Sequence, residues 1–325
     1  MIKLSRRTAI AGLATLPLVS ARAQTVDFPD RPLRFIVGFP PGGPNDLLAR
    51  VIAPGIGERL KRTVVVENRA GANGEIAAAS VAKAPPDGGV FMLASNGSTT
   101  VAPALNRSMP YDIRTDFAAV APVGINPMLL VVRNDLPAAN IAELLALARA
   151  RPGKLNGASA GANGATHLAL ELFKSMGRVD IVHVPYKGAG AGVIDLVGGQ
   201  VQLSFVSIPT GLPFIKNNRL RALGVTTLKR TALYPDIPTI AEAALPGYDM
   251  SNWVGLMAPA QTPPEIVARL NAEIARWMVL PDTQQKMLAL GVDAGGGSAS
   301  SFTETIARGY ALMGRTIQVS GIKVD

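Results

Sequence analysis

The stretch Arg34-Phe-Ile-Val-Gly-Phe-Pro-Pro-Gly-Gly-Pro-Asn-Asp-Leu-Leu-Ala-Arg50 predicts a buried strand, then a loop of proline and glycine, then a helix. Pro44 suits the first helical position, where a missing N–H costs nothing. Glycine lets the backbone bend sharply and approach a ligand closely. We expect the N–H groups of Asn45, Asp46 and Leu47 to point out of the helix N-terminus. Such an end carries about half a positive charge and suits an anion.

A second strand, loop and helix follow the same pattern in Lys154-Leu-Asn-Gly-Ala-Ser-Ala-Gly-Ala-Asn-Gly-Ala-Thr-His-Leu168. Ser159, Asn163 and Thr166 offer hydroxyl or amide groups, and the glycines allow close approach of a ligand to the backbone. One such loop is most often an ordinary turn between a strand and a helix. Two of them, in two predicted domains, favour a ligand-binding role.

The first 23 residues have the features of an export signal. Arg6-Arg7 precede an apolar segment, 9–19, that is too short to span a bilayer, and Ala21-Arg22-Ala23 resembles a cleavage site. Ser5-Arg6-Arg7 also resembles a twin-arginine signal, but Ala9 stands where a large apolar residue is usual, so the Tat and Sec routes both remain open. We predict cleavage near Ala23 and a periplasmic protein.

The composition excludes several classes of function. The chain has no cysteine, which excludes a disulfide framework and a lipoprotein anchor on cysteine. The formal net charge of +9 falls to +5 once the four basic residues of the signal are removed, and the remaining basic residues are scattered. With 5% aromatic residues, a nucleic-acid-binding surface is not expected. Two histidines and scattered carboxylates do not suggest a metal site, and we expect no cofactor.

Short apolar runs alternate with helical patterns, which predicts an α/β protein with largely parallel sheets. The predicted strands are 33–37, 64–67, 90–94, 128–132, 155–158, 181–184, 203–206, 223–226 and 254–258. The predicted helices are 45–60, 141–150, 165–176, 190–197, 263–278 and 302–319. Thr262-Pro263-Pro264-Glu265 predicts a helix with a threonine cap, proline at N1 and glutamate at N3.

The length favours two domains, and two strand-like crossings, near 120–125 and 252–258, indicate where the chain passes between them. We predict one discontinuous lobe from residues 24–124 and 253–325, and a second lobe from residues 125–252. This layout places a cleft between the lobes, where ligands commonly bind. Asn96-Gly97-Ser98-Thr99-Thr100 is rich in neutral donors and is a plausible third wall of that cleft.

Two motifs suggest other chemistry. Residues 157–161 match G-x-S-x-G, which would make Ser159 the nucleophile of a hydrolase. In a nucleophile elbow the strand turns directly into the helix, but here several residues intervene, and no histidine follows His183. We therefore expect a protein that is not an enzyme and keep the hydrolase as an alternative. The run 188–193 begins like a dinucleotide-binding fingerprint but lacks its third glycine and its acidic partner.

Ordered motifs along the whole mature chain carry a family resemblance. They are Phe39-Pro-Pro-Gly-Gly-Pro-Asn-Asp46, Val65-Val-Glu-Asn-Arg69, Lys83-Ala-Pro-Pro-Asp-Gly88, Pro110-Tyr-Asp112, His183-Val-Pro-Tyr-Lys-Gly188, Gly198-Gly-Gln-Val-Gln202, Leu220-Arg-Ala-Leu-Gly224, Pro235-Asp-Ile-Pro-Thr239 and Leu245-Pro-Gly-Tyr248. Together they resemble the Bug family, the periplasmic substrate-binding proteins of tripartite tricarboxylate transporters. The resemblance implies a two-lobed, type II Venus-flytrap fold with a central cleft and two hinge crossings. It also implies a monomer that delivers its ligand to the membrane permease subunits of the transporter.

The resemblance further implies a small organic carboxylate, aliphatic or aromatic, held between the two glycine-rich loops, partly through ordered waters. The implied ligand-binding residues of the first loop are Phe39, Gly42, Gly43, Pro44, Asn45 and Asp46. Those of the second are Ser159, Gly161, Asn163, Gly164, Thr166 and His167, and the far end of the ligand would meet Ser98, Thr99, Tyr186 and Ser207. A sensor that presents its ligand to a membrane kinase is an alternative with the same binding chemistry.

Three positions depart from the family pattern. Many relatives carry aspartate where this chain has Val206, which favours a plain carboxylate over an amino acid as the ligand. Ala162 and Ala165 replace residues that are often polar, which leaves backbone donors in the second loop. Asp46 stands beside the expected anion, so it either orients the first loop or accepts a hydrogen bond from the ligand or from a water.

Overall fold

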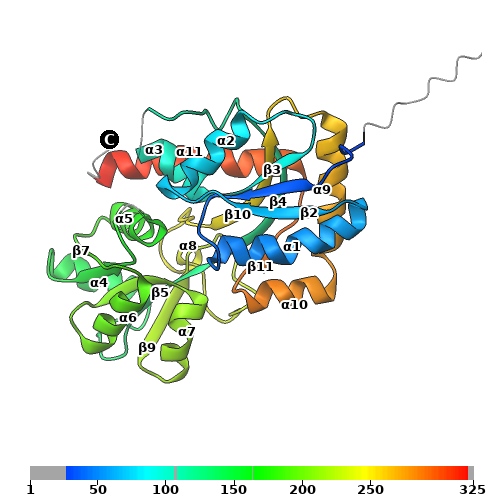
Figure 1. The fold of residues 1–325 in the computed structure, drawn as a ribbon. Helices are drawn as coiled ribbons and strands as arrows, with labels where there is room; N and C mark the ends of the chain where they lie inside the picture. Colours follow the sequence, from blue (N-terminus) through cyan, green and yellow to red (C-terminus); the bar gives the residue numbers. More distant parts are fainter. Residues whose placement is uncertain (1–26, 106–107, 163, 321–325) are drawn as a thin grey trace, which may run out of the picture.

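A computed structural model describes residues 27–105, 108–162 and 164–320 of the chain. The predicted signal and its cleavage site lie outside the described residues, as does Asn163 of the second loop. The described chain forms two β-sheets with helices against their faces, one sheet above the other in Figure 1.

The first sheet has six strands in the order β11-β4-β10-β3-β1-β2. Their bounds are β1 Leu33–Val37, β2 Val64–Asn68, β3 Val90–Ser95, β4 Phe117–Asn126, β10 Asn252–Pro259 and β11 Asp293–Ala294. All six residues of β3 are buried, as expected for a central strand with helices on both faces.

The second sheet has five strands in the order β7-β6-β8-β5-β9. They are β5 Met128–Arg133, β6 Asn156–Ser159, β7 Val182–Pro185, β8 Leu203–Ser207 and β9 Leu220–Val225. The chain changes sheet twice, between β4 and β5 and between β9 and β10, close to the two crossings that the sequence indicated.

The prediction of largely parallel sheets is wrong, because each sheet is mixed. β1 is parallel to β2 and β3, and β6 is parallel to β7 and β8. The strands at the sheet changes run the other way: β10 is antiparallel to β3 and β4, and β5 is antiparallel to β8 and β9. Parallel neighbours need a long crossover connection, whereas Pro127 alone joins β4 to β5.

The helices include the six predicted ones with small shifts of their ends. The longer helices are α1 Pro44–Leu60, α2 Glu75–Ala82, α4 Ile141–Ala150, α5 Ala165–Gly177, α6 Ala189–Gly198, α7 Ile208–Lys216, α9 Pro264–Met278, α10 Pro281–Ala289 and α11 Ala299–Ser320. The short ones are η1 Ala72–Gly74, η2 Gly97–Val101, α3 Ala102–Leu105 and α8 Ile240–Ala243. None of the described helices is both long and apolar enough to cross a membrane.

The predicted start of α9 is wrong by one residue. Pro263 is the N-cap and Pro264 occupies N1, so no side chain caps the helix. Thr262 is instead buried, and its Oγ1 has no partner among the described residues. The second of two adjacent prolines therefore takes the position that needs no N–H.

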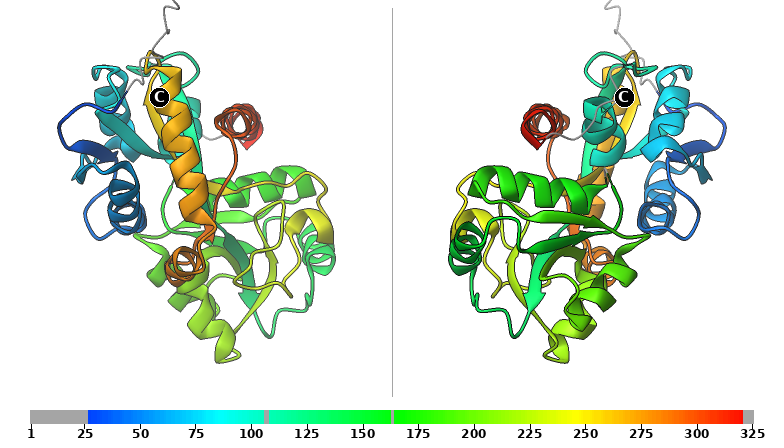
Figure 2. Two further views of the ribbon diagram at one scale, coloured as in Figure 1. Left: turned by 90° about the vertical axis from the view of Figure 1, so that its right-hand side faces the viewer. Right: turned by 90° about the vertical axis from the view of Figure 1, so that its left-hand side faces the viewer.

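α11 returns from the first sheet to pack beside α5 of the second, as Figures 1 and 2 show. Met313 and Ile317 of α11 belong to a hydrophobic core that includes residues of β5, β8 and β9. The two halves of the molecule are thus held by the two strand crossings and by this helix.

Candidate functional site

The first loop, residues 39–46, is shaped by the buried carboxylate of Asp46. This side chain is 1% exposed and accepts hydrogen bonds from the Gly42 N–H, from Arg50 Nε and from Asn68 Nδ2, each at 2.9 Å. The bond from Arg50, helped by those from Gly42 and Asn68, lowers the pKa of Asp46 to about 2 although burial opposes this. Asp46 therefore stays ionised and holds the loop from behind.

Asn68 ties the same loop to the first sheet. It ends β2 opposite Val37, and its Nδ2 also donates to the carbonyl oxygen of Phe39 at 3.1 Å. The sequence analysis did not select Arg50 or Asn68. The four-residue spacing between Asp46 and Arg50 on a predicted helix was a usable signal for the first of these.

The loop presents a helix N-terminus to the space between the two sheets. Gly43 is the N-cap of α1 and Pro44 its first residue. The prediction that Leu47 has a free N–H is wrong, because that group donates to the Gly43 carbonyl oxygen at 3.0 Å and closes the first helical turn. The N–H groups of Asn45 and Asp46 have no such partner among the described residues.

The second loop, residues 159–167, is held in place by hydrogen bonds of uncharged side chains. Thr166 Oγ1 accepts a hydrogen bond from the Ala160 N–H at 2.9 Å, and Ser159 Oγ lies 2.6 Å from His183 Nε2. Gly164 caps α5, as Gly43 caps α1. Gly161 has φ +150°, a backbone conformation that favours glycine.

Beneath this loop lies a cluster of titratable side chains. The rings of His167 and His183 stack at 3.7 Å, and His167 Nε2 lies 3.6 Å from the Oε1 of Glu171, which also accepts a hydrogen bond from Lys174. Burial, together with the neighbouring His167, lowers the pKa of His183 to about 4. His183 is therefore neutral near pH 7. Ser159 and His183 are far apart in the sequence, so the sequence analysis did not predict this contact.

The N-termini of α1 and α5 line the same cavity, which has a volume of about 300 Å³. Gly43, Pro44 and Asn45 of α1 line it, as do Gly164 and Ala165 of α5. The other lining residues are Phe39, Pro40, Asn73, Ser95, Asn96, Gly97, Val101, Asn126, Met250 and Asn252. No acidic, basic or histidine side chain is among these lining residues.

The structure places the other predicted site residues around this cavity rather than in its lining. Gly42 and Asp46 support the first loop, whereas Ser159, Gly161, Thr166 and His167 lie within or under the second. Ser98 and Thr99 are fully buried and donate to the carbonyl oxygen of Ser95. Tyr186 donates to Asp195, and the exposed Ser207 contacts Thr210.

The lining contains five asparagines, of which the sequence analysis selected Asn45 as a ligand-binding residue and Asn96 as part of a third wall of the cleft. Asn126 and Asn252 face one another across β4 and β10 at the sheet change. Asn73 belongs to η1, and Asn96 follows β3. Asn73, Asn126 and Asn252 are far apart in the chain, so no local motif marked them.

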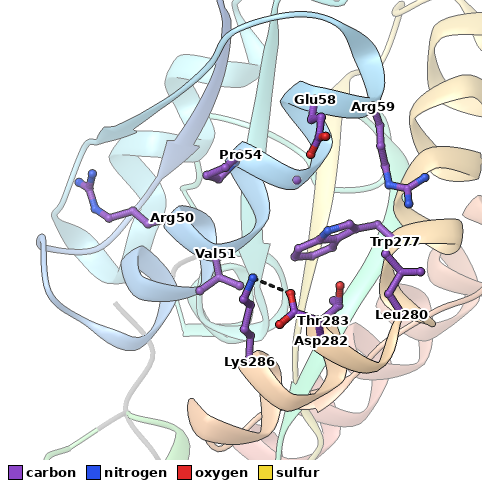
Figure 3. Close-up of a pocket in the computed structure, with 11 residues that line it drawn as sticks. Arg50, Val51, Pro54, Glu58, Arg59, Trp277, Leu280, Asp282, Thr283 and Lys286 are labelled. Carbon is purple, nitrogen blue, oxygen red and sulfur yellow. Dashed lines mark ion pairs between the residues drawn. The ribbon is translucent and has the colours of Figure 1, made fainter.

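Other hollows lie away from the loops. The largest, about 760 Å³, is an outer groove between α1, α9 and α10, with Trp277 on its floor and the ion pair of Lys286 with Asp282 at its edge (Figure 3). A hollow of about 510 Å³ lies behind the sheet change, and a chamber of about 50 Å³ adjoins both it and Asn96. Neither helix N-terminus reaches these three spaces. Among the described residues, no group of three or more His, Asp or Glu side chains is placed to hold a metal ion.

Comparison with known proteins identifies the family. Residues 48–322 match the model of the "Tripartite tricarboxylate transporter family receptor". The chain is 36% identical to Protein BugT of Bordetella pertussis over 275 residues, which are 84% of each chain.

Two solved structures from Rhodopseudomonas palustris share the fold. One, described as Rpa4515 with adipate, has 36% identity and a TM-score of 0.74, and the match covers 91% of this chain and 99% of that one. The other, MatC with bound malate, has 30% identity and a TM-score of 0.70, with 89% and 100% covered. The predicted two-lobed periplasmic-binding-protein fold is thereby confirmed, and the chain belongs to the tripartite tricarboxylate transporter receptor family.

Proposed function

We propose that this protein captures a small organic carboxylate in the cavity between the first and second loops. The observation that carries the proposal is that the N-termini of α1 and α5 line one cavity. Both ends bear partial positive charge, and both have N–H groups without a partner among the described residues, at Asn45 and Asp46 and at Ala165 and Thr166. Hydrogen bonds from such groups to a carboxylate are short and strong.

The arrangement of the sheets supports a two-lobed receptor that closes on its ligand. We assign residues 24–124 and 253–325 to one lobe and 125–252 to the other, with hinges at the two places where the chain changes sheet. Each lobe contributes one loop, so closure brings the two N-termini onto the same carboxylate and excludes water. The Ser98, Thr99, Tyr186 and Ser207 side chains would then shape the surroundings of the cavity rather than contact the ligand.

The relatives support the class of ligand and the place of the protein in the cell. The two Rhodopseudomonas structures contain adipate and malate, both of them carboxylates. We infer that this protein is a monomer without catalytic activity that is exported with the loss of residues 1–23. It would deliver its ligand to the permease subunits of a tripartite tricarboxylate transporter.

A thermal-shift screen of the mature protein tests this proposal. Adipate, malate, succinate and benzoate should each be tried at millimolar concentration, with glucose and magnesium chloride as controls. A ligand at one hundred times its Kd stabilises the folded state by about 2.7 kcal/mol, which is a shift of several degrees. Stabilisation by glucose or magnesium with none by any carboxylate would overturn the proposal.

One contact favours a second candidate, a serine hydrolase. Ser159 Oγ lies 2.6 Å from His183 Nε2, the geometry of a nucleophile and its general base. Against this, Ser159 is 2% exposed and is not in the cavity lining, so a substrate does not reach it in this conformation. Release of nitrophenol from p-nitrophenyl acetate that disappears in Ser159→Ala would favour the hydrolase; equal background rates in both proteins would exclude it.

A further inference from the structure

The cavity between the loops has an unusual lining of uncharged amides. Asn45, Asn73, Asn126 and Asn252 all line it, and none of their side-chain amides hydrogen-bonds to another described residue. Each amide offers two N–H donors and one carbonyl acceptor. The part of the ligand that lies beyond the carboxylate therefore meets groups that both donate and accept hydrogen bonds.

Asn96 adds a buried acceptor whose orientation is fixed. Its side chain is 7% exposed, and Nδ2 donates to the carbonyl oxygen of Ser251 at 2.7 Å. Only the NH₂ group can face a carbonyl oxygen, so Oδ1 must point the other way. Oδ1 is buried and has no hydrogen-bond partner among the described residues. Because this oxygen is buried, a ligand in the cavity does not reach it in this conformation.

The residues that line the cavity also restrict the charge and the size of the ligand. Because no lysine, arginine or histidine lines the cavity, a second carboxylate would find no cation to offset its desolvation. Phe39 is the single aromatic side chain in the lining, which offers little to an aromatic acid. A volume of about 300 Å³ lies at the small end of the range for ligand pockets, which suits a short ligand.

Resting on the proposed function, we propose that the ligand is a short polyhydroxy monocarboxylate, a small sugar acid. Its carboxylate lies between the N-termini of α1 and α5. Its hydroxyl groups exchange hydrogen bonds with the side-chain amides of Asn45, Asn73, Asn126 and Asn252.

Titration calorimetry with matched ligands tests this inference. Threonate and butyrate have the same four carbons and one carboxylate, and they differ in three hydroxyl groups. Each hydroxyl that pairs with an otherwise unpartnered amide contributes about 1 kcal/mol, so threonate should bind at least tenfold more tightly than butyrate. Adipate serves as a carboxylate without hydroxyls and should also bind more weakly than threonate.

The outcomes separate this inference from the proposed function. If butyrate or adipate binds as tightly as threonate, the inference is wrong and carboxylate capture stands. If threonate, butyrate and adipate all fail to bind but another carboxylate of the thermal-shift screen binds, the inference is likewise wrong and carboxylate capture stands. If no carboxylate binds, the proposed function itself fails.

A variant localises the effect to the cavity. Replacing the facing pair, in Asn126→Leu with Asn252→Leu, keeps the branched shape and the number of non-hydrogen atoms of each side chain and removes both amides, so the preference for threonate should fall at least threefold. The control is Asn217→Leu, at an exposed asparagine after α7 whose side chain makes no hydrogen bond with a described residue. An unchanged preference in the double variant would place the hydroxyl groups elsewhere, and the comparison in the unmodified protein holds even if that variant folds poorly.

Discussion

The two loops present the same structural element, a helix N-terminus after a strand, but they are supported by different chemistry. The first is held by an ionised carboxylate, Asp46, which accepts hydrogen bonds from Gly42, Arg50 and Asn68. The second is held by neutral hydroxyl and imidazole groups, chiefly Ser159 and His183. The comparison teaches that an acid can support a loop that we propose to bind an anion, because the hydrogen bonds it accepts come from the loop and its neighbours.

The largest effect is expected from placing a negative charge on one helix N-terminus. Ala165→Asp puts a carboxylate on the first residue of α5, in the cavity lining, and should weaken adipate binding at least a hundredfold by repulsion. The folded state should keep its stability or gain a few tenths of a kcal/mol, since an acid in the first turn of a helix is favourable. Calorimetric titration and thermal unfolding measure the two quantities separately.

The control for this variant is Ala299→Asp, which makes the same change on the first residue of α11. It should leave binding unchanged. A similar loss of affinity in both variants would show that overall charge, and not the N-terminus of α5, controls binding.

The second largest effect is expected from a substitution of Asp46, the ionised side chain that holds the first loop. Asp46→Asn replaces one accepting oxygen with an NH₂ group that must face the Gly42 N–H, Arg50 or Asn68, so one of these donors loses its partner. We expect a loss of 1–3 kcal/mol of stability, on the order of a buried unpaired polar group, and at least tenfold weaker adipate binding. Urea unfolding and calorimetry measure both.

Asp282→Asn provides the matched change at an exposed ion pair with Lys286. That variant should lose less than about 1 kcal/mol. If Asp46→Asn behaves like this control, Asp46 is only a helix residue near the loop.

A smaller effect is expected from pH, through His183, which supports the second loop. The pKa of His183 is lowered from its ordinary value of 6.5 to about 4 in the folded protein, so between these values the unfolded chain binds more protons. The free energy of unfolding therefore has its full value above pH 6.5. It decreases as the pH drops toward 4, by at most about 1.4 kcal/mol per pH unit. Urea unfolding at pH 7 and pH 5 should show this loss.

His183→Gln should flatten the dependence between pH 7 and pH 5. Asp46, with a pKa of about 2, remains ionised throughout and does not contribute. A pH dependence that persists unchanged in His183→Gln would assign the titration to another group.

The smallest effect is expected from Ser159→Ala. The substitution removes the neutral hydrogen bonds of Ser159 Oγ with His183 and with the backbone of Gly161, while Thr166 still accepts from the Ala160 N–H. Stability should fall by about 1 kcal/mol and adipate affinity by less than tenfold. A complete loss of binding, measured by the same titration, would mean that Ser159 contacts the ligand directly.

Much of this architecture could be predicted from local patterns. Apolar runs located nine of the eleven strands, and the proline and glycine positions located both loops. β4 was indicated only as a crossing, because Pro122 and Gly124 interrupt its apolar pattern. The direction of β5 and β10 could not be predicted, since it depends on how the chain passes between the sheets.

The site could be predicted only in part from the sequence, for a related reason. The helix N-termini are local features, and five predicted residues, Phe39, Gly43, Pro44, Asn45 and Gly164, line the cavity. The amides of Asn126 and Asn252 meet only because two distant segments pair at the sheet change. Ser98 and Thr99 have the right chemistry, but the helical turn of η2 directs their hydroxyls to the carbonyl oxygen of Ser95.

The most direct test of the account is a crystal structure of the mature protein with adipate. The account predicts one carboxylate group between the two loops, about 2.7–3.2 Å from N–H groups at the N-termini of both α1 and α5, or joined to them by one water. A carboxylate bound instead in the outer groove beside Trp277, with both N-termini open to solvent, would contradict it.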